Sequence, residues 1–201
     1  MRHDLPVRFD HNDHYHPLLL SLVPAGAQRA LDVGCGTGRF ARALADRGLS
    51  VDALDADKKV IDAARPAPGV RYAVVDVTTK APPAGTYDFI SCVASLHHLP
   101  FDTLADLRDA LRPGGVLAVL GLYRGGPADY AKAPLVVPLN LGLRAALSRK
   151  PDTDEEQVRP QVRDPEMTLP EIRERAAELL PGAVISPRLF WRYVLAYRHP
   201  A

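Results

Sequence analysis

The sequence is poor in cysteine, in net charge and in long apolar runs, and each shortage narrows the possible functions. Its two cysteines, Cys35 and Cys92, lack a CxxC or other metal-ligand spacing, so we expect reduced thiols. Lys and Arg total 25 against 24 Asp and Glu, and the formal charge of +1 gives no field that favours nucleic acid or a membrane as partner. No uncharged apolar run approaches the ~20 residues that span a bilayer, and the N-terminus lacks the apolar core of a signal peptide. We therefore expect a cytoplasmic protein that acts on a small molecule, without stable membrane insertion.

The 201 residues fit one compact domain in which apolar segments alternate with helical ones. Strands are expected at residues 29–33, 50–54, 70–75, 87–92 and 116–122. Helices are expected between them at 39–47, 57–65 and 101–111, with a turn at 112–115. Near-continuous apolar strands separated by helices predict a parallel sheet covered on both faces.

After residue 124 the alternation breaks, and it returns with a helix at 170–180 and two strands near 184–189 and 191–197. These last two strands can close the sheet as an antiparallel pair. The whole pattern predicts an α/β, Rossmann-like fold, with a seven-stranded, mostly parallel sheet, helices on both faces and an antiparallel C-terminal strand.

A glycine-rich loop follows the first strand. Gly34, Gly36 and Gly38 lack Cβ atoms, so the backbone can turn sharply and approach a ligand, while the helix near Arg39 directs its N-terminal amides to that ligand. Ligands of open parallel sheets bind beyond the carboxyl ends of the strands, which is where this loop lies. The loop begins like the GxGxxG fingerprint of dinucleotide-binding enzymes, but Arg39 stands where that fingerprint has its third glycine.

Residues 31–38, LDVGCGTG, resemble the signature loop of class I S-adenosylmethionine (SAM)-dependent methyltransferases, of the broad group that methylates small molecules. The resemblance continues in order through Asp55, residues 75–77, residues 87–99 and the LRPGG of residues 111–115. It implies a methyltransferase that moves a methyl group from SAM to an O, N or C atom of a small-molecule acceptor and releases S-adenosylhomocysteine. A SAM-binding module without transferase activity, or an NAD-dependent enzyme, remains the alternative.

The resemblance also implies roles for residues around the loop. Asp55 would bind the ribose hydroxyls, and Asp76 would accept from the adenine amino group while the Val77 N–H donates to a ring nitrogen. Ala56 and Val93 would line the adenine and the rest of the cofactor. Cofactor binding is further assigned to Asp32, which would orient the loop and the methionine ammonium, and to Gly34, Cys35, Gly36 and Gly38.

His97 and His98 follow the fourth strand and are the candidate catalytic residues. Methyl transfer depends mostly on proximity and orientation, but a hydroxyl or protonated amine acceptor must lose a proton, and histidine can take it near neutral pH. Adjacent helical residues do not share a face, so we expect at most one of the two rings in the cavity. Purely structural roles for both residues are the alternative.

Three segments lie outside the cofactor-binding core at 29–124, within a single domain of residues 1–201. An N-terminal lid or helix is expected in 1–28, where Tyr15 or His14 could contact the methionine carboxylate; the histidines there match no zinc spacing, and no metal is expected. The insertion at 125–169 is expected to cap the acceptor. Its apolar run, 135–143, could line the pocket, lie on a membrane or dimer surface, or pack on the sheet.

The remaining segment, 170–201, supplies a helix and a closing hairpin. Tyr123 and Arg124 are expected on the acceptor side, and Trp191, Arg192 and Tyr193 in the hairpin. The acceptor and the oligomeric state stay open.

Overall fold

The computed structural model describes residues 12–126, 163–189 and 191–201. Within them, seven strands form one sheet in the order β3-β2-β1-β4-β5-β7-β6. The neighbouring pairs from β3 to β5 are parallel, whereas β7 is antiparallel to both β5 and β6, so six strands share one direction. The predicted fold class is confirmed. The strands are β1 (Arg29–Val33), β2 (Ser50–Asp55), β3 (Val70–Val74), β4 (Tyr87–Val93), β5 (Leu111–Leu122), β6 (Val184–Arg188) and β7 (Arg192–Arg198).

Short helices connect these strands. The helices predicted at 57–65 and 101–111 are shorter at both ends, the one at 39–47 is shorter at its C-terminal end, and the one at 170–180 begins and ends one residue earlier. None in the described part of the chain has the length and apolar character needed to cross a membrane. The α-helices are α1 (His16–Leu20), α2 (Arg39–Ala45), α3 (Lys58–Asp62), α4 (Thr103–Asp109) and α6 (Leu169–Leu179), and two 3₁₀ turns are η1 (Asp13–Tyr15) and η2 (Leu96–His98).

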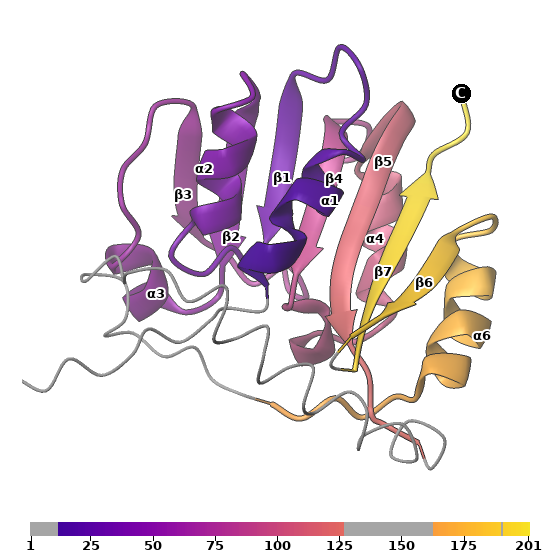
Figure 1. Ribbon diagram of the computed structural model, residues 1–201. Coiled ribbons are helices and arrows are strands. Elements are labelled where there is room, and N and C mark those ends of the chain that lie inside the picture. The colour runs from indigo at the N-terminus through magenta and orange to yellow at the C-terminus, as the bar shows by residue number, and fades with distance from the viewer. Residues whose placement is uncertain (1–11, 127–162, 190) are drawn as a thin grey trace, which may run out of the picture.

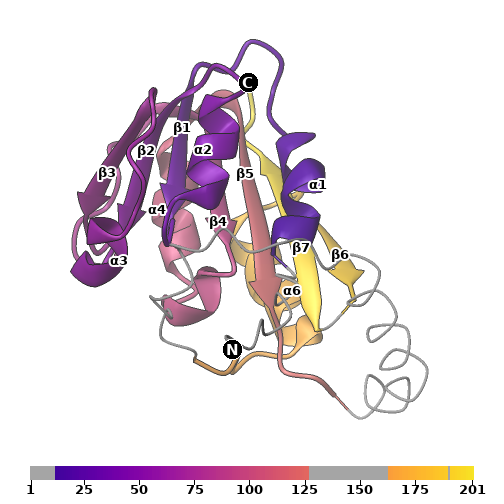
Figure 2. The same ribbon diagram turned by 60° about the vertical axis from the view of Figure 1, so that its left-hand side comes forward.

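Helices cover both faces of the sheet and form two separate cores. In Figure 1, α1 and α2 lie in front of the sheet and α4 and α6 lie behind it, and Figure 2 shows the same layers from the side. Successive residues of β1 divide between the cores, because side chains alternate along a strand. Ala30 packs with Leu44 of α2, whereas Leu31 packs with Leu107 of α4.

The start of β5 differs from the sequence prediction. Residues 112–115 were expected to form a turn before a strand at 116, but β5 begins at Leu111 and contains them. The register with β4 moves from Tyr87↔Leu111 to Phe89↔Val116, so the pairing advances further along β5 than along β4, as it does at a bulge. Gly114 supplies the left-handed residue, with φ of 76°.

Asp88 aligns the amino ends of the parallel strands, at the edge away from the glycine loop. Its Oδ2 accepts hydrogen bonds from the backbone N–H groups of Gln28 and Arg29, each at 2.9 Å, and Arg112 lies 3.1 Å from Oδ1. Partial burial raises the pKa of Asp88, but these hydrogen bonds outweigh burial and hold the pKa below its usual range.

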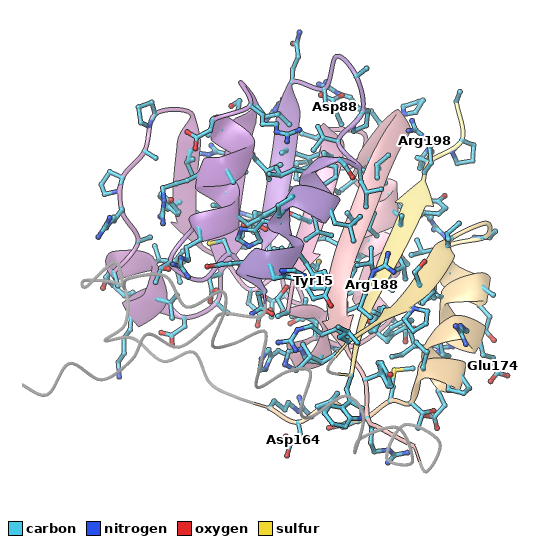
Figure 3. All side chains as sticks on the ribbon, in the orientation of Figure 1. Tyr15, Asp88, Asp164, Glu174, Arg188 and Arg198 are labelled. Carbon is cyan, nitrogen blue, oxygen red and sulfur yellow. The ribbon has the colours of Figure 1, made fainter. Side chains whose placement is uncertain are left out.

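We expect Asp88→Ala to lower the free energy of unfolding by about 1–2 kcal/mol at neutral pH, a value reduced by partial solvation of the carboxylate. Because the folded pKa is the lower one, this contribution is complete above the unfolded value of about 3.9 and is lost as the pH falls through the folded pKa. Urea denaturation between neutral pH and about pH 3 measures it. Asp164→Ala, at the exposed carboxylate labelled in Figure 3, is the control, and equal losses in both variants would refute the role of Asp88.

Candidate cofactor and acceptor site

The loop between β1 and α2 depends on three left-handed glycines. Gly34, Gly36 and Gly38 have φ of 66°, 57° and 82°, a region in which other residues are strained. A Cβ on Gly34 would collide with Ser95, and one on Gly38 with the ring of Tyr72. A Cβ on Gly36 would meet nothing within 4 Å, so this glycine faces open space that a ligand can enter.

Asp55, at the end of β2, holds this loop in place. Its Oδ2 accepts from the Gly36 N–H at 3.0 Å, and its Oδ1 accepts from the Asp57 N–H at 2.9 Å. The Cys35 N–H also donates to the Leu54 carbonyl, at 2.9 Å. Each carboxylate oxygen can accept more than one hydrogen bond, so Asp55 keeps capacity for ligand hydroxyls.

Asp32 lies at the carboxyl end of β1 and is only 1% exposed. The Ser91 hydroxyl donates to its Oδ1 at 2.7 Å, while Oδ2 has no hydrogen-bond partner among the described residues. Burial raises the pKa of Asp32 to about 7; the Ser91 hydrogen bond opposes this shift and the charge of Asp55 adds to it. A buried carboxylate with one unpaired oxygen suits a cationic ligand group such as an ammonium.

Asp76 and Val77 follow β3 at the same edge of the sheet. Asp76 is exposed, and its Oδ1 accepts from the Thr78 hydroxyl at 2.7 Å and the Thr78 N–H at 2.9 Å, which lowers the pKa of Asp76. Val77 is buried. Ala56, after β2, is exposed and Val93, at the end of β4, is half-buried, so both lie next to the loop with surface left to contact a ligand.

Both cysteines are free thiols that belong to the cores. Burial raises the pKa of the Cys35 and Cys92 thiols well above the usual range, so neither forms a thiolate near neutral pH. The Cys35 side chain packs inward, and its backbone is therefore the part that a ligand in the loop can reach. The described residues contain no group of three or more metal-ligating side chains.

The rings of His97 and His98 lie against each other in η2, in a tilted arrangement. Their ring centroids lie 4.1 Å apart with the planes tilted by 42°. The two rings therefore lie side by side and do not point to opposite faces of the turn. Burial lowers the pKa of His97 to about 4, with smaller effects of His98, Arg192 and Arg163, so this imidazole is neutral at pH 7. Its Nδ1 is buried and has no partner in the described part of the chain.

The charge of Asp55, beside the cofactor loop, acts on the His98 ring. Burial and Arg163 lower the pKa of His98, and the charge of Asp55 raises it. Asp55 is absent from the larger effects on His97. Charges at the cofactor loop and at the start of β7 therefore both act on the pair.

The N-terminal segment crosses the site from α2 to the β6–β7 turn. Asp13 forms an ion pair with Arg39 at 2.7 Å, and the Arg192 guanidinium donates to Asn12 Oδ1 at 3.2 Å. Tyr15 is buried at 8% exposure, whereas His14 is exposed. Burial raises the pKa of Tyr15, and Arg192, the Leu189 backbone and Arg188 act in the opposite direction. Tyr15 thus faces the β6–β7 turn.

Several residues of the site were not foreseen from the sequence. Ser91 hydrogen-bonds Asp32, and the Ser95 hydroxyl donates to the Val33 carbonyl at 2.6 Å. Ala94 between them has φ of 53°, an uncommon conformation for alanine, just where β4 ends. The available signal was the two serines in the otherwise apolar segment 89–96.

The acceptor side is described only in part. Most of the expected cap at 125–169, including the run 135–143, lies outside the described residues. Arg124 is exposed, and its N–H donates to the Met167 carbonyl at 2.8 Å. In the closing hairpin Tyr193 is buried and its ring covers Gly121, whereas Arg192 reaches the N-terminal segment.

Sequence comparison identifies relatives of this chain. Residues 30–115 match the family described as a methyltransferase domain. An uncharacterized methyltransferase of Mycobacterium tuberculosis (strain ATCC 25618 / H37Rv) is 34% identical over 196 residues, which cover 94% of this chain and 96% of the relative. The ubiquinone biosynthesis O-methyltransferase of Xanthomonas axonopodis pv. citri is 38% identical over 121 residues, or 56% of this chain and 49% of the relative.

Solved structures share the fold at lower identity. A phosphoethanolamine N-methyltransferase 2 of Haemonchus contortus gives a TM-score of 0.65 at 17% identity, over 94% of this chain and 53% of that one. A SAM-dependent methyltransferase of Mesorhizobium loti gives 0.60 at 18% identity, over 94% and 100%. The solved structures show that the chain has the fold of SAM-dependent methyltransferases, and the relative matched over almost the whole chain shows that it belongs to the methyltransferase family.

Proposed function

We propose that the protein transfers the methyl group of SAM to an O, N or C atom of a small-molecule acceptor in the cytoplasm, with S-adenosylhomocysteine as the second product. The observation that carries this proposal is the combination of an open Gly36 with the unpaired Oδ2 of Asp32 at one sheet edge. The first leaves space for a cofactor against the backbone. The second is a buried acceptor of the kind that an amino-acid ammonium requires.

Each residue near the loop has a role in this proposal. Asp55 binds the ribose hydroxyls through the acceptor capacity that its two backbone hydrogen bonds leave. Asp76 accepts from the adenine amino group through Oδ2, since Thr78 occupies Oδ1, and Val77 donates its N–H to the ring. Ala56 and Val93 contact the cofactor from either side, and Asp32 binds the ammonium.

SAM supplies a methyl group that its sulfonium already activates, so the protein contributes mostly position and exclusion of water. His97 and His98 stand beside the reaction, and a neutral imidazole there can accept the proton of a hydroxyl or amine. Tyr15 and residues 12–14 cover the site in this proposal, and the role proposed for the insertion at 125–169, within a single domain of residues 1–201, is to cap the acceptor.

Replacing Gly36 with Val should abolish binding of S-adenosylhomocysteine, because the side chain fills the space the cofactor needs. Gly26→Val is a matched control, since Gly26 also has a left-handed φ, 77°, and an equally open Cβ position, but lies before β1. Both variants carry the same backbone strain. Calorimetry on both, with circular dichroism to verify folding, should show binding lost only in Gly36→Val; normal binding there would reduce the loop to a turn.

Cofactor affinity should depend on pH through Asp32. Ionised Asp32 is the form that pairs with an ammonium, and its pKa in the free protein is about 7. Affinity for S-adenosylhomocysteine should therefore be highest near about pH 8, where Asp32 is ionised and the ligand ammonium is still largely charged, and fall by up to about tenfold per unit as the pH drops below 7. The other groups facing Asp32 are Ser91, Asp55, the Tyr72 hydroxyl and the thiols of Cys35 and Cys92. Burial raises the pKa values of Tyr72 and both thiols, which keeps all three neutral throughout.

Calorimetric titrations between about pH 6 and pH 8.5 measure this dependence. Asp32→Asn keeps the size and removes the titration, so its weaker binding should be flat over the same range. A wild-type profile as flat as that of Asp32→Asn would remove Asp32 from the ammonium site.

Single His97→Ala and His98→Ala variants distinguish a general base from scaffold roles. Loss of a base should cut turnover by about 10²–10⁴ at constant SAM affinity, because the interaction exists mainly in the transition state. Loss of a packing residue should instead lower the melting temperature, while activity per folded molecule changes less than about tenfold. We expect at least one of the two to behave as a packing residue, since the rings pack against each other.

Turnover is followed as S-adenosylhomocysteine formed with a panel of small phenols, amines and carboxylates, alongside cofactor affinity and melting temperature. If the wild-type protein binds the cofactor but methylates no acceptor of the panel, the result favours a SAM-binding module without transferase activity. A base-like loss in both histidine variants would contradict the packing role.

A further inference from the structure

Two arginines stand directly opposite each other at the acceptor end of the sheet. Arg188 ends β6 and Arg192 begins β7, and the register pairs them across the antiparallel ladder. Arg192 also pairs with Leu122 at the end of β5, which places both at the carboxyl edge that carries the cofactor loop. Side chains at opposite positions share a face of the sheet, and like charges so placed destabilise the pair.

Arg188 is partly withdrawn from solvent without full hydrogen bonding. Its Nε is buried and has no partner among the described residues, and its Nη1 makes only a long 3.4 Å contact to the Pro187 carbonyl. A buried guanidinium N–H that lacks an acceptor is unfavourable. The β6–β7 hairpin thus holds the Arg188 guanidinium where a bound anion would supply the missing hydrogen-bond acceptor.

Arg192 is oriented toward the same side by the N-terminal segment. Its guanidinium donates to Asn12 Oδ1, at 3.2 Å from Nη2. This hydrogen bond to a neutral amide fixes the position of the guanidinium. Figure 3 shows Tyr15 and Arg188 near each other at this place, far from Arg198 at the other end of β7.

The electrostatic environment of the neighbouring site residues is cationic. Beside burial, the pKa of Tyr15 is shifted by the charges of Arg192 and Arg188. The pKa of His97 is shifted by burial, by His98, and by Arg192 and Arg163. Arg163 also pairs with Glu166 at 2.6 Å, so Arg188 and Arg192 are the stronger candidates to bind a ligand.

We propose that the methyl acceptor carries a carboxylate or phosphate group and that Arg188 and Arg192 bind it. This inference rests on the proposed methyltransferase function. A guanidinium presents two parallel N–H groups that match a carboxylate or phosphate edge, and two of them converge here from adjacent strands. The bound anion satisfies the Arg188 Nε and offsets the repulsion between the two cations. It also anchors the acceptor beside His97.

The test measures anion binding to protein saturated with S-adenosylhomocysteine. Inorganic phosphate and succinate are the anionic probes, titrated calorimetrically at constant ionic strength, and succinamide is the neutral counterpart of succinate. We expect saturable binding of phosphate or succinate and none of succinamide, and the stronger probe identifies the group. Arg188→Gln and Arg192→Gln should each weaken the binding about tenfold or more, and Arg188→Lys less than Arg188→Gln.

Arg198→Gln is the matched control, because Arg198 lies exposed on the same strand and donates to the Gly114 carbonyl at the opposite edge of the sheet. It should bind the anions as the wild type does. Equal weakening in Arg198→Gln, or equal binding of succinate and succinamide, would overturn the proposal. Affinity for S-adenosylhomocysteine is measured in the wild type and in every variant. If the wild type does not bind S-adenosylhomocysteine, the result counts against the methyltransferase function. If it binds the cofactor but not the anions, the result counts against this inference alone.

A second measurement needs no variant. The pKa of the His97 imidazole, followed by NMR on cofactor-saturated wild-type protein, should rise when phosphate or succinate is bound, since an anion beside the arginines favours the imidazolium. Titration with succinamide should leave it unchanged. An unaltered His97 pKa at saturating phosphate and succinate would contradict the proposal even if the arginine variants fail to fold.

Discussion

The site depends on one constraint, the close approach of backbone to ligand in the loop after β1. Gly34 and Gly38 are fixed by what surrounds them, since a Cβ on either would collide with Ser95 or Tyr72. Gly36 is free of such contacts, and its N–H is tied to Asp55 on the next strand. The loop is therefore rigid on its protein side and open on its ligand side. This combination lets backbone amides and a carboxylate act together at the carboxyl edge of a parallel sheet.

The fold could be predicted from the sequence because its signals are local. Apolar runs that end in glycine or aspartate mark β1 and β2, and the alternation of strand and helix then requires a parallel sheet. The same holds for the loop and for Asp32, Asp55 and Asp76, which follow strands in order. Helix ends were less predictable, as in α3, which begins only after Asp57 caps it through a hydrogen bond from the Lys59 N–H.

Contacts between distant segments could not be predicted in this way. Asn12 and Arg192 are 180 residues apart in sequence, and neither carries a signal that it meets the other. The pairing of Arg188 with Arg192 follows from the register of one hairpin, in which a shift of one residue would move each side chain to the other face. The close approach of the His97 and His98 rings in η2 was not predicted either, because neighbouring residues of a helical turn do not share a face.

The net charge of the chain also gave no indication of how charged side chains are distributed along the carboxyl edge of the sheet. A total of +1 suggests no field, yet the charges at the carboxyl edge are sorted by position. Asp32, Asp55 and Asp76 gather around the cofactor loop, where the proposed ligand brings an ammonium and a sulfonium. Arg188 and Arg192 gather at the end of β7, where the proposed acceptor brings an anion. Charges of both groups act on the histidine pair: burial lowers the pKa of both rings, Arg192 lowers that of His97 further, and Asp55 raises that of His98. A donor that is cationic and an acceptor that is anionic would each be drawn to its own half of one edge, and their reacting atoms would meet at the histidine pair.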